Sequence, residues 1–157
     1  MNTNYLPYFI MEMSAALGAN YRVVMAHSRC LSADVNAALD PTFADVHEPR
    51  NAARVNHGVC ITKYTGSGGK YGTNDASAEM MAYVRRVLDD ADVLWQTGEL
   101  GKVDQGGGGT VAKFIAKLDI DTVDVGVPML AMHSPWELVA KLDVYMTYRA
   151  FAAFCAD

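Results

Sequence analysis

Short β-branched segments alternate with segments of helical periodicity along this chain, and this alternation restricts the fold more than any other feature. Strands are predicted at 59–64, 93–96 and 121–127, and helices at 5–17, 75–90 and 110–118. The order predicts an α/β domain in which helices flank a layered sheet. No repeat or linker divides the 157 residues, so we expect a single domain over 1–157.

Several boundaries follow from local signals. Gly18 is a natural stop for the first helix, and Asn74 or Asp75 is a suitable cap for the helix that ends at Asp90. A strand-like or irregular segment is expected to lead to Asp34. A last helix is predicted to open at 133–137, with Ser134 as its cap and a proline in the first helical position.

Charge and cysteine content exclude several classes of protein. The net charge is −5 and basic residues are interleaved with acidic ones, so we expect no nucleic-acid partner. The first segment lacks a basic start and is interrupted by polar residues, which predicts neither a signal peptide nor a membrane span. Three widely spaced cysteines do not suggest a disulfide framework, and a reducing cytoplasm is the expected location.

Two residues are candidates for metal binding. Asp34 comes at the end of an apolar segment. The alternative to metal binding is an ordinary role as a solvated loop residue or a helix cap. His133 follows a predicted buried strand, and active sites of open α/β sheets gather at the carboxyl ends of strands. A neutral imidazole there can ligate zinc, but it can also be a structural histidine bonded to the backbone.

Two glycine-rich turns are candidates for substrate binding. Gly106–Gly109, followed by Thr110, allows close approach of the backbone to a ligand. The alternatives for this segment are a flexible turn, a cradle for a substrate carbonyl or carboxylate, and a phosphate loop. Lys113 follows the threonine rather than preceding it, which breaks the phosphate-loop pattern. Lys63 and Tyr71 flank the other turn, either as substrate-facing groups or as ordinary solvated residues.

These pieces together resemble the aminopeptidase I (aspartyl aminopeptidase-like) family of two-zinc metallopeptidases in order and spacing, from about Tyr5 to the end. The resemblance is carried by Ser-Ala-Asp-Val-Asn-Ala-Ala at 32–38, by Gly-Gly-Thr at 108–110 and by Val-Asp-x-Gly-x-Pro-x-Leu-x-Met-His-Ser at 123–134. The Lys-Tyr-Thr-Gly motif at 63–66 is most similar to the bacterial branch of this family.

The resemblance implies a zinc-dependent aminopeptidase that removes amino-terminal residues from peptides and, as a whole enzyme, forms large homo-oligomers. It implies two zinc ions, one bound by Asp34 and the other by His133. The implied substrate-pocket residues are Lys63, Tyr71, Gly108, Gly109 and Thr110. Ala37 stands where aspartyl-specific members have a histidine, so the preferred amino-terminal residue stays open.

Part of the family's site has no counterpart in this chain. Family enzymes also have an early histidine, a bridging aspartate and a Glu-Glu pair that supplies the general base, all upstream of the Ser-Ala-Asp motif. Only 33 residues precede Asp34 and the chain contains no Glu-Glu dipeptide. We therefore expect a truncated, carboxy-terminal part of the catalytic domain that is inactive alone. The alternatives are a catalytically silent binding or assembly domain and a nucleotide-dependent enzyme that uses the glycine loop.

Overall fold

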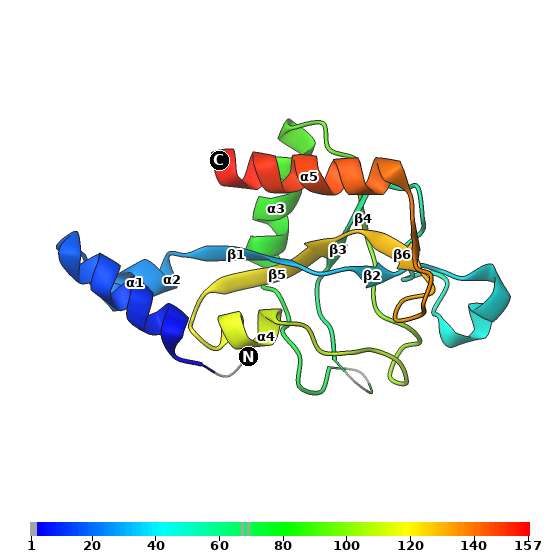
Figure 1. Ribbon diagram of the computed structural model, residues 1–157, viewed down its shortest axis with the longest axis horizontal. Coiled ribbons are helices and arrows are strands. Elements are labelled where there is room, and N and C mark those ends of the chain that lie inside the picture. Colours follow the sequence, from blue (N-terminus) through cyan, green and yellow to red (C-terminus); the bar gives the residue numbers. More distant parts are fainter. Residues whose placement is uncertain (1–2, 67, 69) are drawn as a thin grey trace.

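The computed structural model describes residues 3–66, 68 and 70–157. Helices and strands alternate over most of that length, as the sequence predicts (Figure 1). In chain order the elements are α1 (Tyr5–Ala16), α2 (Tyr21–Ala26), β1 (Arg29–Ala33), β2 (Asn36–Ala37), the 3-10 helix η1 (Pro41–Val46), β3 (Val59–Thr62), α3 (Ala78–Asp90), β4 (Trp95–Thr97), α4 (Ala112–Ala116), β5 (Asp121–Gly126), β6 (Pro128–Leu130), β7 (Leu138–Val139) and α5 (Lys141–Ala156).

The strands form two sheets, and one pair of parallel strands runs from the first sheet into the second. The larger sheet has the order β1-β5-β3-β4, in which β5 is parallel to β1 and antiparallel to β3. The smaller sheet has the order β2-β6-β7. Because β2 follows β1 and β6 follows β5 after only one or two residues, the β1–β5 pair leads directly into the β2–β6 pair (Figure 1).

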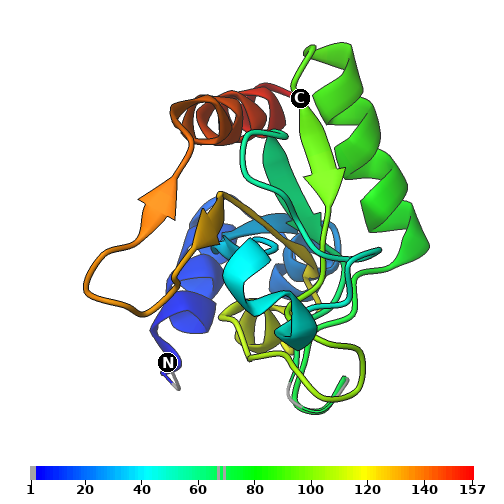
Figure 2. The ribbon, with the colours of Figure 1, turned by 90° about the vertical axis from the view of Figure 1, so that its right-hand side faces the viewer.

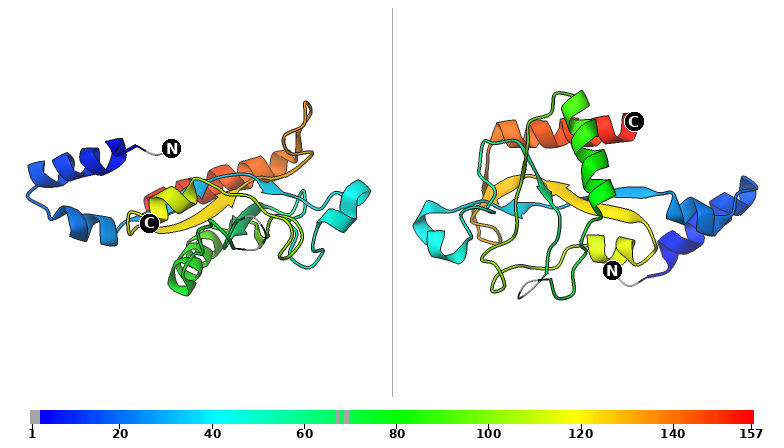
Figure 3. Two further views of the ribbon diagram at one scale, coloured as in Figure 1. Left: turned by 90° about the horizontal axis from the view of Figure 1, so that it is seen from below. Right: turned by 180° about the vertical axis from the view of Figure 1, so that it is seen from behind.

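The hydrophobic core lies on one face of the larger sheet, beneath α3 and α5. Alternate residues of the strands point to this face because successive side chains of a strand project to opposite sides. The two helices cross over it, as seen from behind in Figure 3. The buried core residues are Leu31, Val59, Ile61, Ala76, Met80, Val84, Leu88, Val93, Val123, Val125 and Ala150.

The opposite face of the same sheet is buried but polar. The strand register aligns Ser32, Asp124 and Thr62 in one row across β1, β5 and β3, and all three are less than 10% exposed. The Thr62 hydroxyl accepts a hydrogen bond from the Asn36 side chain at 2.7 Å. We call Ser32, Asp124 and Thr62 the polar row.

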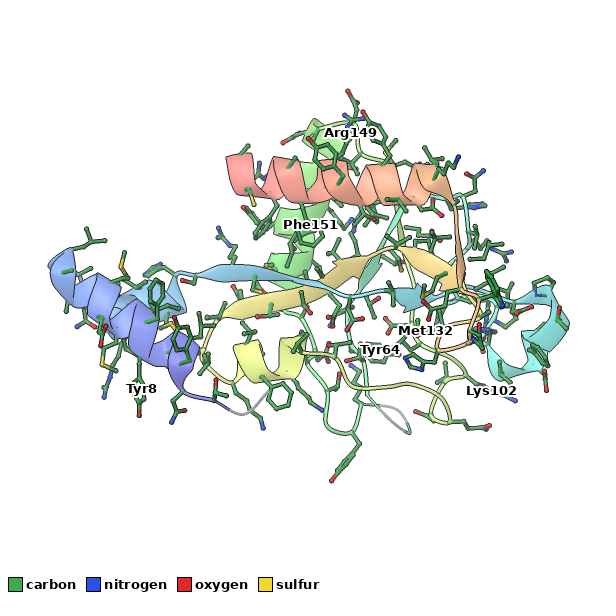
Figure 4. All side chains as sticks on the ribbon, in the orientation of Figure 1. Tyr8, Tyr64, Lys102, Met132, Arg149 and Phe151 are labelled. Carbon is green, nitrogen blue, oxygen red and sulfur yellow. The ribbon has the colours of Figure 1, made fainter. Side chains whose placement is uncertain are left out.

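The first two helices project from the body as an arm (Figures 1 and 3). Ser14 is the only buried residue that α1 has, and Tyr8 points into solvent (Figure 4). The exposed apolar residues of α1 and the turn after it are Tyr5, Leu6, Tyr8, Phe9, Met11, Met13 and Leu17. Despite this apolar surface, none of the helices in the described part of the chain is long and apolar enough to span a bilayer.

The structure corrects the starts of two helices, and it confirms the strand-like segment that leads to Asp34, which is β1. Residues 21–26, just before β1, form helix α2, which was not predicted from the sequence; the Asn20 side chain caps this helix by accepting from Arg22 N at 2.9 Å. Helix α3 is capped by Ser77. The predicted cap Asn74 instead donates its side-chain amide to Thr122 O at 2.8 Å, and Asp75 binds lysine side chains.

The predicted helix at 133–137 is wrong, because α5 begins only at Lys141. The chain first makes a turn in which Ala131 and His133 have positive φ, and it then forms β7, which pairs with β6. The Ser134 hydroxyl closes this turn by donating to Trp136 O at 2.7 Å, so it does not cap a helix. The local Ser-Pro signal was overridden by pairing with a neighbouring strand.

Candidate functional site

Asp34 lies at the junction between the two sheets, directly after β1. Its Oδ1 accepts a hydrogen bond from Val35 N at 2.9 Å, and its side chain is partly buried. The backbone of Gly126 on β5 passes so close that a Cβ placed there would lie 1.5 Å from Asp34 O. Only glycine, which has no side chain, allows this close contact at position 126, and the contact fixes the path of the chain at Asp34.

His133 lies three residues beyond β6, in the turn that leads to β7. Its backbone N–H donates to Glu137 Oε1 at 2.7 Å, and its side chain is exposed. Since β2 and β6 are adjacent and parallel, Asp34 lies just before the start of this strand pair and His133 just after its end. His133 lines a cavity in the described part of the chain, and Asp34 is not among the residues that line it.

The donor set fits zinc chemistry only in part. A carboxylate and an imidazole are ordinary zinc ligands, but a catalytic zinc ion usually has three protein ligands and one open position. Over residues 3–66, 68 and 70–157, no group of three or more His, Cys, Asp or Glu side chains is arranged to hold a metal ion. Asp34 and His133 would therefore need further ligands from outside the described residues.

Lys63 is engaged by a neighbouring carboxylate. Its ammonium group donates to Asp75 Oδ1 and, at 2.9 Å, to Ala76 O. Lys70 donates to Asp75 Oδ2 at 2.6 Å, so two lysines share one carboxylate. The hydrogen bonds from Lys63 and then Lys70 hold the pKa of Asp75 below its usual range. Tyr71, the other predicted substrate residue on this turn, is 83% exposed.

The two glycine-rich turns lie side by side. Gly66 N donates to Gly108 O at 2.7 Å, and Gly68 N donates to Gly106 O at 3.1 Å. The structure thus brings the predicted substrate residues of one turn close to those of the other. Gly109 packs against Lys113, whose ammonium group would lie 2.8 Å from a Cβ at that position.

Asp124 is a site residue that the sequence reasoning did not single out. It is 3% exposed, its Oδ2 accepts from the Thr110 hydroxyl at 2.9 Å, and its Oδ1 has no partner among the described residues. Burial, reinforced by the charge of Asp34, raises the pKa of Asp124. The signal available in the sequence was an acidic residue inside a β-branched strand, where burial of an unpaired charge is costly.

The 3-10 helix η1, the 101–110 loop and the β6–β7 segment lie at the end of the molecule opposite α1 (Figure 2). Residues of all three line one cavity, and residues of the loop also line a neighbouring one. The first has a volume of about 440 Å³ and is mostly apolar. His133, Met132, Phe43 and Ala37 line this His133 pocket. The second, of about 350 Å³, is lined by Glu99 and includes Tyr64 and Lys102. Figure 4 shows Tyr64, Lys102 and Met132 in this half of the molecule.

Glu99 has the most strongly shifted carboxyl group of this region. Burial raises its pKa from 4.5 to about 8, and the nearby charge of Lys70 offsets only part of that rise. Its backbone N–H is held by Asn51 O at 2.7 Å, while its Oε2 is buried with no partner among the described residues. At neutral pH this side chain is mainly protonated.

The raised pKa of Glu99 predicts a pH-dependent stability. The folded protein binds the Glu99 proton more tightly than the unfolded chain, so the free energy of unfolding should fall as the pH rises from about 4.5 to about 8. Glu99→Gln should remove this part of the slope, by less than the full pKa shift implies, because Glu99 is partly exposed to screening solvent. Urea unfolding across this pH range measures the slope. The exposed Glu79→Gln is the control and should leave the slope unchanged. If Glu99→Gln also leaves the slope unchanged, the raised pKa of Glu99 is contradicted.

The fold and these motifs define a class of protein. The family model described as aminopeptidase I zinc metalloprotease (M18) matches residues 1–155, and the chain belongs to this family. The predicted family and fold class are therefore confirmed.

Particular relatives are similar over most of this chain. A probable M18 family aminopeptidase 1 of Thermotoga neapolitana is 52% identical over 130 residues, which is 83% of this chain and 29% of that protein. The crystal structure of the M18 aminopeptidase from Thermotoga maritima superposes with a TM-score of 0.91 at 42% identity, covering 97% of this chain and 35% of that one. Aminopeptidase I from Clostridium acetobutylicum gives a TM-score of 0.85 at 45% identity, covering 93% and 33%. The chain spans about a third of the length of these relatives.

Proposed function

We propose that this chain contributes part of the active site of a zinc-dependent aminopeptidase that removes amino-terminal residues from peptides. The observation that carries the proposal is the family match over 1–155 together with two zinc-type donors, Asp34 and His133, at the two ends of the β2–β6 pair. In the proposed site each donor holds one of two zinc ions. When bound, zinc acidifies a water molecule and stabilises a developing oxyanion.

The surroundings of the two donors support a substrate-binding role for the adjacent turns. Gly108, Gly109 and Thr110 form a segment with little side-chain bulk, and Thr110 is held in place by the buried Asp124. Lys63 and Tyr71 lie on the turn that is hydrogen-bonded to this segment. In the proposal these five residues line the path of the peptide substrate, with Lys63 acting through a charge that Asp75 partly compensates.

Zinc binding by the chain tests the metal assignment. Two ligands are expected to hold zinc weakly, and Asp34→Ala or His133→Ala should each weaken this binding by roughly tenfold or more, because half of the donor set is lost. The exposed His27→Ala serves as the control and should leave affinity unchanged. Equal zinc affinity in the unsubstituted chain and both ligand variants, measured by competition with a chelating dye, would reject the assignment.

Turnover by the chain alone should be very low. The general-base Glu and the remaining ligands of the family have no counterpart here, so zinc-dependent hydrolysis of leucyl p-nitroanilide should not exceed background. Activity that is lost in His133→Ala would contradict this expectation. Sequencing the DNA upstream of the Met1 codon is the complementary test. An in-frame extension that encodes an early His, an Asp and a Glu-Glu pair would support the peptidase role.

A catalytically silent binding or assembly domain is the second candidate, and the exposed apolar residues of α1 favour it. The same surface supports homo-oligomer formation, because large exposed apolar patches commonly mark association sites. We propose a cytoplasmic location from the three unpaired cysteines. If an assembly role were the whole function, Asp34→Ala and His133→Ala would leave the association state and the cellular role unaffected.

A further inference from the structure

We propose that the cavity lined by Glu99, which we call the Glu99 pocket, is a subsite for the ammonium or guanidinium side chain of a basic residue in the peptide substrate. That the bound side chain belongs to a substrate rests on the proposed function, whereas the site itself is defined by the shape and charge of the cavity. The residues that carry it are Glu99, Lys70, Leu100 and Val103.

The Glu99 side chain is partly buried, and one of its two carboxyl oxygens lacks a partner among the described residues. Glu99 follows Gly98, whose Cα packs so closely that an added Cβ would lie 2.9 Å from both Ala53 Cβ and Cys60 Sγ. The hydrogen bond from Glu99 N to Asn51 O fixes the next peptide unit. The backbone is therefore held in place, while the buried Oε2 makes no hydrogen bond within the described part of the chain.

Two lysines line the same pocket. The ammonium group of Lys70 donates to Asp75 Oδ2 at 2.6 Å, on a carboxylate that it shares with Lys63, and lies 4.5 Å from the centre of the Tyr64 ring. The charge of the other, Lys102, acts on Glu48. No ion pair between Glu99 and a lysine is formed among the residues that the structure describes. A bound cation is thus the partner that the Glu99 carboxylate lacks, since hydrogen bonds between charged groups are the strongest available to it.

The walls of the pocket suit a long cationic side chain. Leu100 and Val103 supply apolar surface along which a methylene stem can lie, and Gly101, Gly106 and Gly107 add no side chains to the wall. Lysine and arginine combine such a stem with a charged head. A neutral side chain would bury the stem but leave the Glu99 carboxyl unpaired.

The Glu99 pocket adjoins the space in front of His133. Leu100, Gly101 and Gly107 line both cavities, so a peptide residue held near His133 has access to the Glu99 pocket across this shared wall. The arrangement predicts a peptidase that favours basic side chains. Ala37 lies in the wall of the His133 pocket, and none of the described residues that line it is a lysine or arginine that would attract an acidic side chain.

Calorimetric titration of the zinc-free chain with small probes tests the subsite separately from catalysis. N-acetyl-L-lysine methylamide carries only the side-chain ammonium group, L-leucinamide carries only the α-ammonium group, and N-acetyl-L-norleucine methylamide carries neither. We expect the lysine probe to bind, with millimolar affinity, at least tenfold more tightly than the other two. At pH 7 its binding should release protons, because burial raises the pKa of the Glu99 carboxyl group and this group must ionise to pair with the probe.

Two variants sharpen the test. Glu99→Gln should weaken the lysine probe at least tenfold and abolish proton release, whereas Glu79→Gln, on the exposed first turn of α3, should change neither. Lys70→Gln should strengthen binding severalfold, since it removes the competing charge and keeps Glu99 intact. Equal binding of the lysine and norleucine probes would overturn the proposal, and so would proton release with L-leucinamide alone, which would assign the pocket to the α-ammonium group. Because no zinc or turnover is involved, failure of the peptidase proposal would not affect this result.

Discussion

Replacing Asp143 with alanine should lower the free energy of unfolding by about 3 kcal/mol. Asp143 lies in the first turn of α5 and is fully buried. Its two carboxylate oxygens accept hydrogen bonds from Asn56 N at 2.6 Å and Gly58 N at 2.7 Å, in the turn that precedes β3. Alanine would leave both N–H groups, of which that of Gly58 is buried, without this acceptor and would detach α5 from the turn.

Urea unfolding followed by circular dichroism measures this loss. Asp143→Asn retains one carbonyl oxygen and should lose less than Asp143→Ala. The control is Asp45→Ala in η1, an exposed aspartate for which we expect a change within about 0.5 kcal/mol. If Asp143→Ala and Asp45→Ala unfold at the same urea concentration, the two hydrogen bonds to Asp143 contribute nothing to stability.

The second large effect is expected at Gly126, where alanine should destabilise the protein by about 4 kcal/mol or prevent folding. The added Cβ would lie 1.5 Å from Asp34 O and 2.5 Å from Asp34 C. These are backbone atoms between β1 and β2, so relief requires the two strand pairs to separate rather than a side chain to rotate. The substitution would therefore also displace Asp34.

Gly108→Ala is the matched control for stability. A Cβ at Gly108 has no atom within 4 Å, and its φ is not positive, so we expect a change within about 0.5 kcal/mol. The yield of soluble protein and the urea midpoint are compared for the two variants. A Gly126→Ala protein as stable as Gly108→Ala would show that the chain at Asp34 moves freely, and the fixed position argued for this candidate ligand would be wrong.

Periodicity predicted most of the fold because strands and helices here carry clear local signals. The helix at 75–90 has buried residues at helical spacing, and the strand at 121–127 is β-branched, so both were found within a few residues. The start of α5 was missed because Ser134 and Pro135 mimic a helix start. Only the pairing of Leu138 with Leu130, a tertiary contact, decides that this stretch becomes β7.

The candidate site was predictable only in part. The motifs that contain Asp34 and His133 made them candidate zinc ligands through the family resemblance, and the glycine turns marked segments where a backbone can approach a ligand closely. The roles of Asp124 and Glu99 depend on burial, and burial results from the packing of strands and loops distant in sequence. A sequence contains no direct measure of how far a carboxylate lies from water, so neither residue stood out.

The central position of β5 has a consequence for synthesis of the protein. β1 is complete at residue 33, yet its partner in the sheet begins at residue 121, and β3 also pairs with that late strand. A chain emerging from the ribosome must therefore leave β1 unpaired, and β3 paired on one side only, with β4, until β5 appears. Such long-range pairing slows folding and leaves strand edges exposed to aggregation. We expect the nascent chain to rely on chaperones until residues 121–126 have left the exit tunnel.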